Sequence, residues 1–270
     1  MRTILNPNLT SNDRMAQLRI VGEMRERYTN AIEAYEKLPM SAEETVLWGR
    51  FRDAINQWRQ MNEGFQGDVE LLNRLDIHYP MAFLRDVEVF QRTQSEMQLR
   101  ALTAIQAGRP LVGQEVHAQS DFDRWLTIHT TANPAINVTI SGMRENHVRL
   151  YRAISDINNA VQRGDRAAAN SIYQQELMTT IETLNRYFVV LNEQGIQAAE
   201  TLTRMERVQM VDVMPYLNEL IAGINQIIDY NLSEANDEIR AGDRAIAASY
   251  IMVILAVLIG LVVASALALL

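Results

Sequence analysis

Apolar residues recur at intervals of three and four along most of this chain, which is the spacing of one face of an α-helix. The first such stripe lies between Ser11, which is placed to cap a helix, and Leu38. Its members are Met15, Leu18, Val21, Met24, Tyr28, Ile32 and Tyr35. Pro39 ends this helix. No stretch of useful length alternates between apolar and polar residues, so the pattern predicts an all-α fold.

A second helix begins directly after the first. Ser41 and Glu44 have the spacing of a capping box, in which each side chain accepts a hydrogen bond from the other residue's backbone amide. The apolar face of this helix continues through Val46, Leu47, Phe51, Ile55, Trp58, Met61 and Phe65. Because the turn between the two helices is short, we expect them to be antiparallel neighbours in a helical bundle.

The pattern breaks around residues 76–80 and resumes in a third helix over residues 81–107. Gly108 ends that helix, since glycine readily adopts the left-handed conformation of a helix C-terminus. Residues 111–131 show the least regular pattern in the chain.

Two further helices are predicted in the middle of the chain. Asn133 caps the first, which has Pro134 at its first position and runs to Gln162. Asp165 caps the second. The apolar stripe of this second helix consists of Ala168, Ile172, Leu177, Ile181, Leu184, Phe188 and Leu191.

The last amphipathic stripe begins at Pro215 and leads without a break into a run that holds no charged residue, from Ala245 to Leu270. The stripe consists of Leu217, Leu220, Ile221, Ile224, Ile227, Ile228, Leu232, Ala235 and Ile239. At a rise of about 1.5 Å per residue, the charge-free run spans the roughly 30 Å hydrocarbon core of a bilayer. It predicts a transmembrane helix over residues 248–270 that is continuous with the last bundle helix. No Lys or Arg flanks its far end, so we expect the natural protein to continue.

The amino-acid composition limits the classes of partner that the chain can bind. The chain has 25 Lys and Arg against 33 Asp and Glu, and its net charge of −8 lies entirely before the charge-free run. An acidic surface without a basic cluster argues against nucleic acid as a partner. The chain has no cysteine, which excludes disulfides, thiolate nucleophiles and cysteine-based metal sites. The first residues lack the basic and apolar regions of a secretory signal, so an extracytoplasmic location requires an earlier export segment.

Sequence motifs for catalysis are missing. The four histidines, at positions 78, 117, 129 and 147, form no HExxH pair, and no Glu-x-x-His pairs suggest a di-iron bundle. Neither a Gly-x-Ser-x-Gly nucleophile turn nor a phosphate-binding glycine loop occurs. We therefore expect neither an enzyme nor a cofactor.

Three segments together resemble the chemoreceptor zinc-binding domain. They are HAQSDFDRWL at 117–126, ENHVRLYRAI at 145–154 and GDRAAANSIYQQE at 164–176. The resemblance places Ser120 where that family has its cysteine. It also places His147 on the histidine of its Pro-His pair, and Tyr151 where the family has a second histidine. Phe122 and Trp125 match its aromatic positions.

The departures from that family imply the scaffold without its metal. Zinc requires four ligands, and His147 is the one clear ligand kept, with His117 as the nearest substitute. We therefore expect no metal; if one binds, His147 and His117 are its ligands. The candidate residues for binding another ligand are His117, Ser120, Trp125, His147 and Tyr151.

Two of these candidates have a structural alternative. His147 could be satisfied inside the bundle by Ser120 or Tyr151 instead of contacting a ligand. Trp125 could fill the core between helices, which is the more frequent role of a tryptophan at such a spacing.

Three further segments resemble the four-helix-bundle sensor region of methyl-accepting chemotaxis proteins. They are LNPNLTSNDR at 5–14, KLPMSAEE at 37–44 and LNELIAGINQIIDYNLSEAND at 217–237. The resemblance implies an extracytoplasmic sensor that is anchored in the bacterial inner membrane and dimerises through its bundle helices. It also implies a small-molecule ligand or a binding-protein partner, and a HAMP domain and a cytoplasmic signalling output after the membrane helix.

This interpretation divides the chain into four parts. Residues 1–76 begin the sensor bundle, residues 77–195 form the zinc-binding-like bundle, residues 196–247 return to the sensor bundle, and residues 248–270 cross the membrane. Residues before about 248 are then extracytoplasmic. A continuous helix from bundle to bilayer can carry a small axial or rotational displacement across the membrane.

Three alternatives stay open. The same sensor could feed a histidine kinase or a diguanylate cyclase. The chain could instead be a metal-binding module in which Asp121 or Asp123 joins His117 and His147. It could also be a tail-anchored structural bundle without a ligand, in which case no metabolite would shift its melting temperature.

Overall fold

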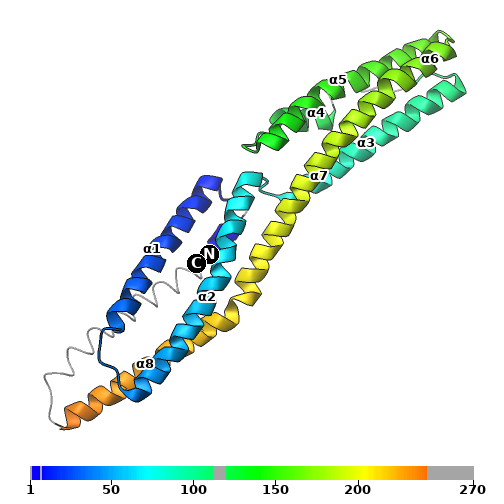
Figure 1. The fold of residues 1–270 in the computed structure, drawn as a ribbon. Coiled ribbons are helices and arrows are strands. Elements are labelled where there is room, and N and C mark those ends of the chain that lie inside the picture. The colour runs from blue at the N-terminus through cyan, green and yellow to red at the C-terminus, as the bar shows by residue number, and fades with distance from the viewer. Residues whose placement is uncertain (1, 7, 112–119, 242–270) are drawn as a thin grey trace. The chain divides into compact units, whose positions relative to one another are not determined.

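The computed structural model describes residues 2–6, 8–111 and 120–241. All regular secondary structure in these ranges is helical, which confirms the predicted all-α class (Figure 1). The chain divides into two compact units. The first contains the residues up to Asn73 and those from Thr201 onward, and the second contains Arg74–Glu200. The divisions expected from the sequence lie after residues 76 and 195.

The membrane prediction concerns a part of the chain that the structure does not describe. The predicted transmembrane helix, residues 248–270, lies outside the described residues. Within those that are described, no helix combines the length and the apolar character needed to cross a bilayer.

The first unit is built on α1 (Ser11–Tyr35), α2 (Ala42–Leu75) and α8 (Met214–Ala241), with a short 3-10 helix, η1 (Arg2–Leu5), before them. The ring pairs between α1 and α2 show that these helices are antiparallel, as predicted. Tyr35 packs on Trp48 with ring centroids 4.4 Å apart, whereas Tyr28, two turns earlier, meets Trp58 at 6.1 Å. Ascending positions on α1 therefore face descending positions on α2.

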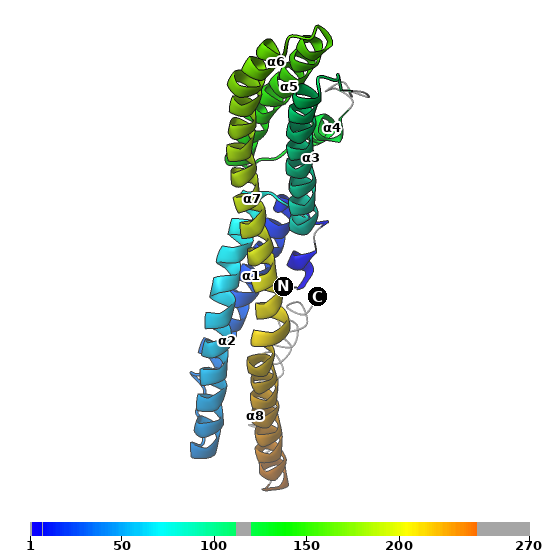
Figure 2. The same cartoon turned by 90° about the vertical axis from the view of Figure 1, so that its right-hand side faces the viewer.

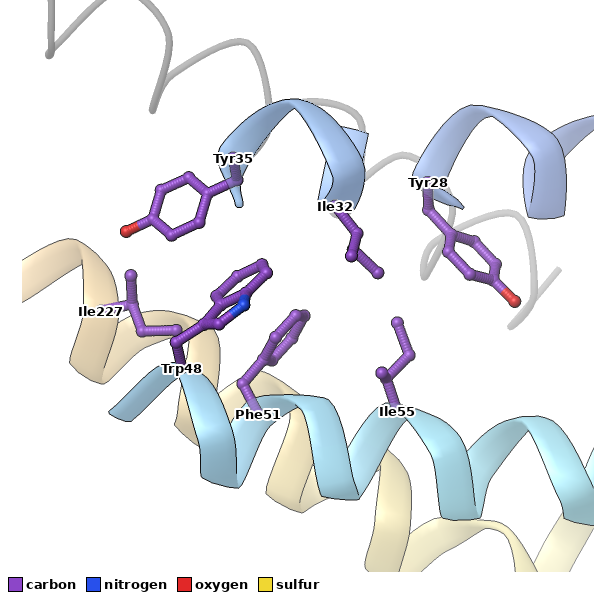
Figure 3. Close-up of a cluster of buried hydrophobic side chains, with 7 residues drawn as sticks. All are labelled: Tyr28, Ile32, Tyr35, Trp48, Phe51, Ile55 and Ile227. Atoms are coloured by element: carbon purple, nitrogen blue, oxygen red, sulfur yellow. The ribbon is translucent and has the colours of Figure 1, made fainter. Parts of the chain in front are cut away.

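Aromatic and β-branched side chains form the core of this unit, and α8 contributes to it from the other end of the sequence. The buried members are Tyr28, Ile32, Tyr35, Trp48, Phe51, Ile55 and Ile227 (Figure 3). The first half of the α1 stripe is not in this core, because Met15 is 46% exposed. Arg14, which lies off the stripe, is buried instead and donates to the Ile4 carbonyl oxygen at 3.4 Å.

The cap of α1 lies one residue earlier than predicted. Thr10 is the N-cap: its hydroxyl accepts a hydrogen bond from the Asp13 amide at 3.2 Å, and the Asp13 carboxylate accepts one from the Thr10 amide at 3.0 Å. Hydrogen bonds from Thr10 lower the pKa of Asp13. The prediction of Ser11 was wrong because the third residue after Ser11 is Arg14, which cannot close a capping box.

Only half of the capping box predicted for α2 forms. The Ser41 hydroxyl accepts a hydrogen bond from the Glu44 amide at 3.1 Å. The Glu44 carboxylate does not return to Ser41; it accepts a hydrogen bond from the Tyr35 hydroxyl, and Glu44 is buried. The Glu44 side chain therefore lies inside the first unit instead of closing the capping box.

The second unit contains α3 (Pro80–Ala107), α4 (Asp121–Ile128), α5 (Pro134–Gln162) and α6 (Arg166–Ile172), together with most of α7 (Met178–Arg207). In both views α3, α5 and α7 lie side by side (Figure 2). Helix α4 falls in the segment predicted to be least regular, and its eight residues were not predicted as a helix.

Three predicted helix ends in this unit are confirmed. Gly108 ends α3 in the left-handed conformation, with φ 61°. The Asn133 side chain accepts hydrogen bonds from the Ala135 and Ile136 amides ahead of Pro134. The Asp165 side chain caps α6 by accepting a hydrogen bond from the Ala168 amide at 2.9 Å.

Two π-helical segments, η3 (Tyr173–Leu177) and η4 (Val208–Asp212), precede and follow α7. In η4 the Val213 amide donates to the Val208 carbonyl oxygen at 3.0 Å, five residues back. Pro215 follows and has no amide hydrogen for the carbonyl four residues before it, so a widened turn is a way to accommodate it. The final helix accordingly begins at Met214, next to the predicted Pro215.

Candidate functional site

The site predicted from the sequence lies where α4 packs on α5, inside the second unit. Ser120 is the N-cap of α4, and its hydroxyl accepts a hydrogen bond from the Asp123 amide at 3.0 Å. His147 and Tyr151 lie one turn apart on α5. His117 lies outside the described residues.

The structure brings Ser120, His147 and Tyr151 together. Ser120 Oγ lies 3.0 Å from His147 Nε2. The His147 ring meets the edge or face of two further rings, with centroids 4.9 Å from Tyr151 and 5.0 Å from Phe122. Ser120 is 7% exposed and His147 is 3% exposed. This is the arrangement of the structural alternative, in which Ser120 satisfies the histidine inside the bundle.

Trp125 lies in an aromatic layer that also contains Phe83, Phe90 and Phe122. It is 9% exposed, and its ring centroid is 5.6 Å from Phe90, 5.8 Å from Phe83 and 6.3 Å from Phe122. These contacts come from α3 as well as from α4 itself. Trp125 therefore fills the space between helices, as the second structural alternative describes.

His129, at the C-terminal end of α4, covers this aromatic layer. Its ring stacks on Trp125 at a centroid distance of 4.5 Å and lies 5.6 Å from Phe83. Burial lowers the pKa of His129, while Asp76 and Asp86 act in the opposite direction. Burial among the aromatic rings therefore outweighs the two carboxylates and disfavours the charged form of His129.

The short helix α4 is bound to α5 at both of its ends. At the start, Ser120 meets His147. At the end, the Arg144 guanidinium donates to the Leu126 carbonyl oxygen, with Nε at 3.1 Å. Carbonyl groups in the last turn of a helix have no partner within the helix, so an arginine from a neighbouring helix stabilises that end.

The connections beside α4 are fixed by Asp76. Its carboxylate accepts hydrogen bonds from the Thr131 hydroxyl at 2.9 Å and from the Ala132 amide at 2.6 Å. Its φ of 52° places it in the left-handed region, which is uncommon for a residue other than glycine. Asn133 adds a hydrogen bond to the Leu75 carbonyl oxygen at 3.1 Å. The α2–α3 connection is thereby tied to the segment that starts α5.

The residues proposed for a metal do not assemble into a ligand set where the structure describes them. Nowhere in the described ranges do three or more His, Asp or Glu side chains converge as metal ligands would. The Asp121 carboxylate is largely exposed and pairs with Arg124. Asp123 uses its amide to bind Ser120, and the Nε2 atom of His147 faces the same serine.

Sequence reasoning missed part of this layer. Phe83 and Phe90 lie seven residues apart on the predicted third helix, a spacing that places both on one face, and that signal was available in the sequence. Arg144 could not have been identified, because its partner is a backbone carbonyl of a helix that was not predicted.

The packing of α4 on α5 buries the Ser120 hydroxyl beside His147. A nucleophile must reach its substrate, and the Ser120 hydroxyl is buried between the start of α4 and His147. No family model, curated protein or solved structure matches the chain. Function is therefore inferred from the contacts above and from the resemblances in the sequence.

Proposed function

We propose that this chain is the ligand-sensing region of a bacterial transmembrane chemoreceptor, which passes its signal through α8 to a cytoplasmic output. One observation carries the proposal: α8 is helical up to Ala241, and the charge-free run begins at Ala245. A helix that belongs to the first unit therefore leads, within a few residues, into the predicted membrane segment.

The packing of α8 suits such a role. Its buried side chains, Leu217, Ile227 and Ala235, lie along one face, while the positions between them are half-buried or exposed. Apolar contacts of this kind are not directional, so a small axial or rotational displacement of α8 can exchange one set of them for another.

Ligand recognition is assigned to the α4–α5 region, with His117, Ser120, Trp125, His147 and Tyr151 as the residues concerned. Among the described members, Tyr151 is half-buried and the other three are buried. A ligand would therefore first meet Tyr151 and reach the buried members only if α4 moves away from α5.

The proposed receptor is a homodimer in the bacterial inner membrane, with the residues before about 248 extracytoplasmic. Apolar side chains on α1 and α8 support dimerisation, since Met15, Ile20, Ile221 and Leu232 are 39–46% exposed. A histidine kinase or a diguanylate cyclase is the second candidate for the output.

The ligand test uses the full chain purified in detergent. We expect amino acids, organic acids or aromatic acids to include one compound that raises the melting temperature, because binding at 100 times Kd stabilises the native state by about 2.7 kcal/mol. The matched variant Tyr151→Ala should lose that shift. A flat result over all three compound classes would leave the tail-anchored structural bundle as the better description.

The membrane part has its own test. The full chain should stay with lipid vesicles after an alkaline wash. The variant with Leu258→Arg and Val262→Arg should be released, since each arginine at the centre of a membrane helix costs about 2.5–3.5 kcal/mol. Release of the parent chain by the wash would contradict the anchor.

A further inference from the structure

The carboxylate of Glu44 is buried where three helices of the first unit meet. Glu44, on α2, is 7% exposed. Its Oε1 accepts hydrogen bonds from the hydroxyl of Tyr35, the last residue of α1, and from Nδ2 of Asn231 on α8, the latter at 3.1 Å. Asn231 Nδ2 also lies 3.0 Å from the Tyr35 hydroxyl oxygen. We call these three residues the polar triad.

The polar triad is distinct from the rest of the α8 contact surface, which is mainly apolar. Asn231 is anchored to its own helix by a hydrogen bond from Nδ2 to the Ile227 carbonyl oxygen at 2.9 Å. One residue away, the Tyr230 hydroxyl lies 2.7 Å from the Ser41 hydroxyl. Two consecutive residues of α8 thus hold the α1–α2 hairpin by polar contacts.

Hydrogen bonds of this kind form at only one position of α8, whereas apolar contacts can form at several positions. A displacement of α8 by about 1.5 Å along its axis, the rise of one residue, would keep much apolar contact. It would separate Asn231 from Glu44 and leave a buried carboxylate without its amide donor, which is unfavourable because the desolvated group loses a hydrogen bond. The energetic preference for one register therefore depends on the triad.

The protonation of Tyr35 suits this role. Burial, followed by the hydrogen bond to Glu44, raises the pKa of Tyr35, so the hydroxyl keeps its proton and remains a donor at physiological pH. The Trp48 ring packs on Tyr35 at 4.4 Å and further fixes its position.

We propose that the polar triad of Tyr35, Glu44 and Asn231 sets the register of α8 against the α1–α2 hairpin. A displacement of α8 then has to break this triad first, so the triad determines how much free energy a stimulus must supply. That second statement rests on the proposed function, whereas the register assignment stands on the contacts alone.

The experiment measures the position of α8 by pulsed electron paramagnetic resonance on the full chain. The chain has no cysteine, so spin labels attach only to introduced ones. Glu43 on α2 and Glu234 on α8, both exposed, receive the reporting pair. Glu33 on α1 and Glu43 receive the control pair, which does not involve α8.

Three variants distinguish the triad from general packing. Asn231→Asp puts two carboxylates in hydrogen-bond contact, so the reporting distance should broaden or shift by at least about 1.5 Å, one residue of rise. Glu44→Gln keeps an acceptor oxygen and should retain the parent distance. The double variant exchanges carboxylate and amide, and it should recover a narrow distribution near the parent distance.

Tyr35→Phe provides a milder change if Asn231→Asp does not fold, because it keeps the ring and removes only the hydroxyl. It should broaden the reporting distance and leave the control distance unchanged. The proposal is overturned if Asn231→Asp, or Tyr35→Phe in its place, matches the parent distribution. It is also overturned if the double variant is as broad as Asn231→Asp.

The signalling statement is tested separately. The chain is joined to the output half of a chemoreceptor whose kinase activity can be measured, and Asn231→Asp should change the basal activity at least twofold. If the label distances behave as expected and the joined protein gives no output with any variant, the proposed function fails and the register assignment stands. If the parent fusion responds to the compound found by the melting-temperature screen but Asn231→Asp leaves its activity unchanged, the signalling role of the triad fails.

Discussion

Ser120 Oγ lies 3.0 Å from His147 Nε2, and the same oxygen accepts the amide hydrogen bond that starts α4. One hydroxyl thus both begins a helix and fastens it to α5. Because Ser120 makes both contacts, we expect it to stabilise the folded protein more than an exposed serine does.

Replacing Ser120 by alanine removes the cap and the contact with His147. The loss of a helix N-cap costs about 0.5–2 kcal/mol, and the loss of a buried hydrogen bond adds to it. We expect the free energy of unfolding to fall by about 1–3 kcal/mol in urea titrations. Ser155→Ala, an exposed serine on α5, is the control and should change it by less than about 0.5 kcal/mol. Equal values for the two variants would contradict the dual role.

His129 predicts a pH dependence of stability. Its pKa in the folded protein lies below its ordinary value of 6.5, because burial disfavours the charged ring. As pH falls through about 6.5, the unfolded chain takes up the proton first, so stability is lost on the acid side. His129→Gln should flatten the dependence of the unfolding free energy between pH 7.5 and pH 5.5. Equal slopes for parent and variant would show that His129 is not responsible.

The glycines of the helices predict opposite effects of alanine. A Cβ at Gly195 would lie 2.6 Å from Leu84 Cδ2 and 3.0 Å from Phe83 Cδ1. Gly195→Ala should therefore lower the free energy of unfolding by about 1–3 kcal/mol. At Gly64 nothing lies within 4 Å, so Gly64→Ala should raise it by up to about 1 kcal/mol through helix propensity. Thermal unfolding of both variants measures the difference, and a stabilising Gly195→Ala would be contrary to this packing.

Much of the fold followed from local signals. Gly108, Asn133 and Asp165 mark helix ends through their own side chains or conformations, so the sequence alone places them. Glu44 shows the limit of this reasoning. Its spacing from Ser41 is that of a capping box, but its carboxylate binds Tyr35 because α1 and α2 approach each other closely, and that approach is a property of the tertiary structure.

Sequence reasoning named residues of the candidate site that lie close together, but it left their role open. The neighbourhood of Ser120, His147 and Tyr151 was expected from the resemblance, and the contact between Ser120 and His147 was named as an alternative. Phe188 on α7 completes the layer by packing on Phe122 at 5.7 Å. That contact joins residues 66 positions apart, so no periodicity within one helix could show it.

The spacing of the buried residues on either side of η4 explains its widened turn. They recur at intervals of four: Thr201, Met205, Gln209, Val213 and Leu217. In a regular α-helix each interval of four overshoots a full turn by about 40°, so such a series leaves the buried face after a few turns. A π-helical turn absorbs the excess.

This geometry predicts a difference between two single-residue deletions. Deleting Met210, an exposed residue of η4, should convert the wide turn to a regular one and keep the flanking faces in place. Deleting Gln226, an exposed residue within α8, should rotate every later side chain by about 100° and remove Asn231 from Glu44. We expect the second deletion to lower the melting temperature by more than the first. The opposite order would show that the wide turn is required for another reason.

Two glycines, Gly142 and Gly195, also predict how slowly the backbone of α7 opens to solvent. Gly195 brings α7 close to Leu84 and Phe83 of α3, and Gly142 brings α5 close to Tyr187 of α7. The stretch of α7 between Tyr187 and Gly195 is therefore enclosed by two neighbours at short range. Its backbone amides should be among the slowest in the second unit to exchange with deuterium, and they would mark the part of that unit which unfolds last.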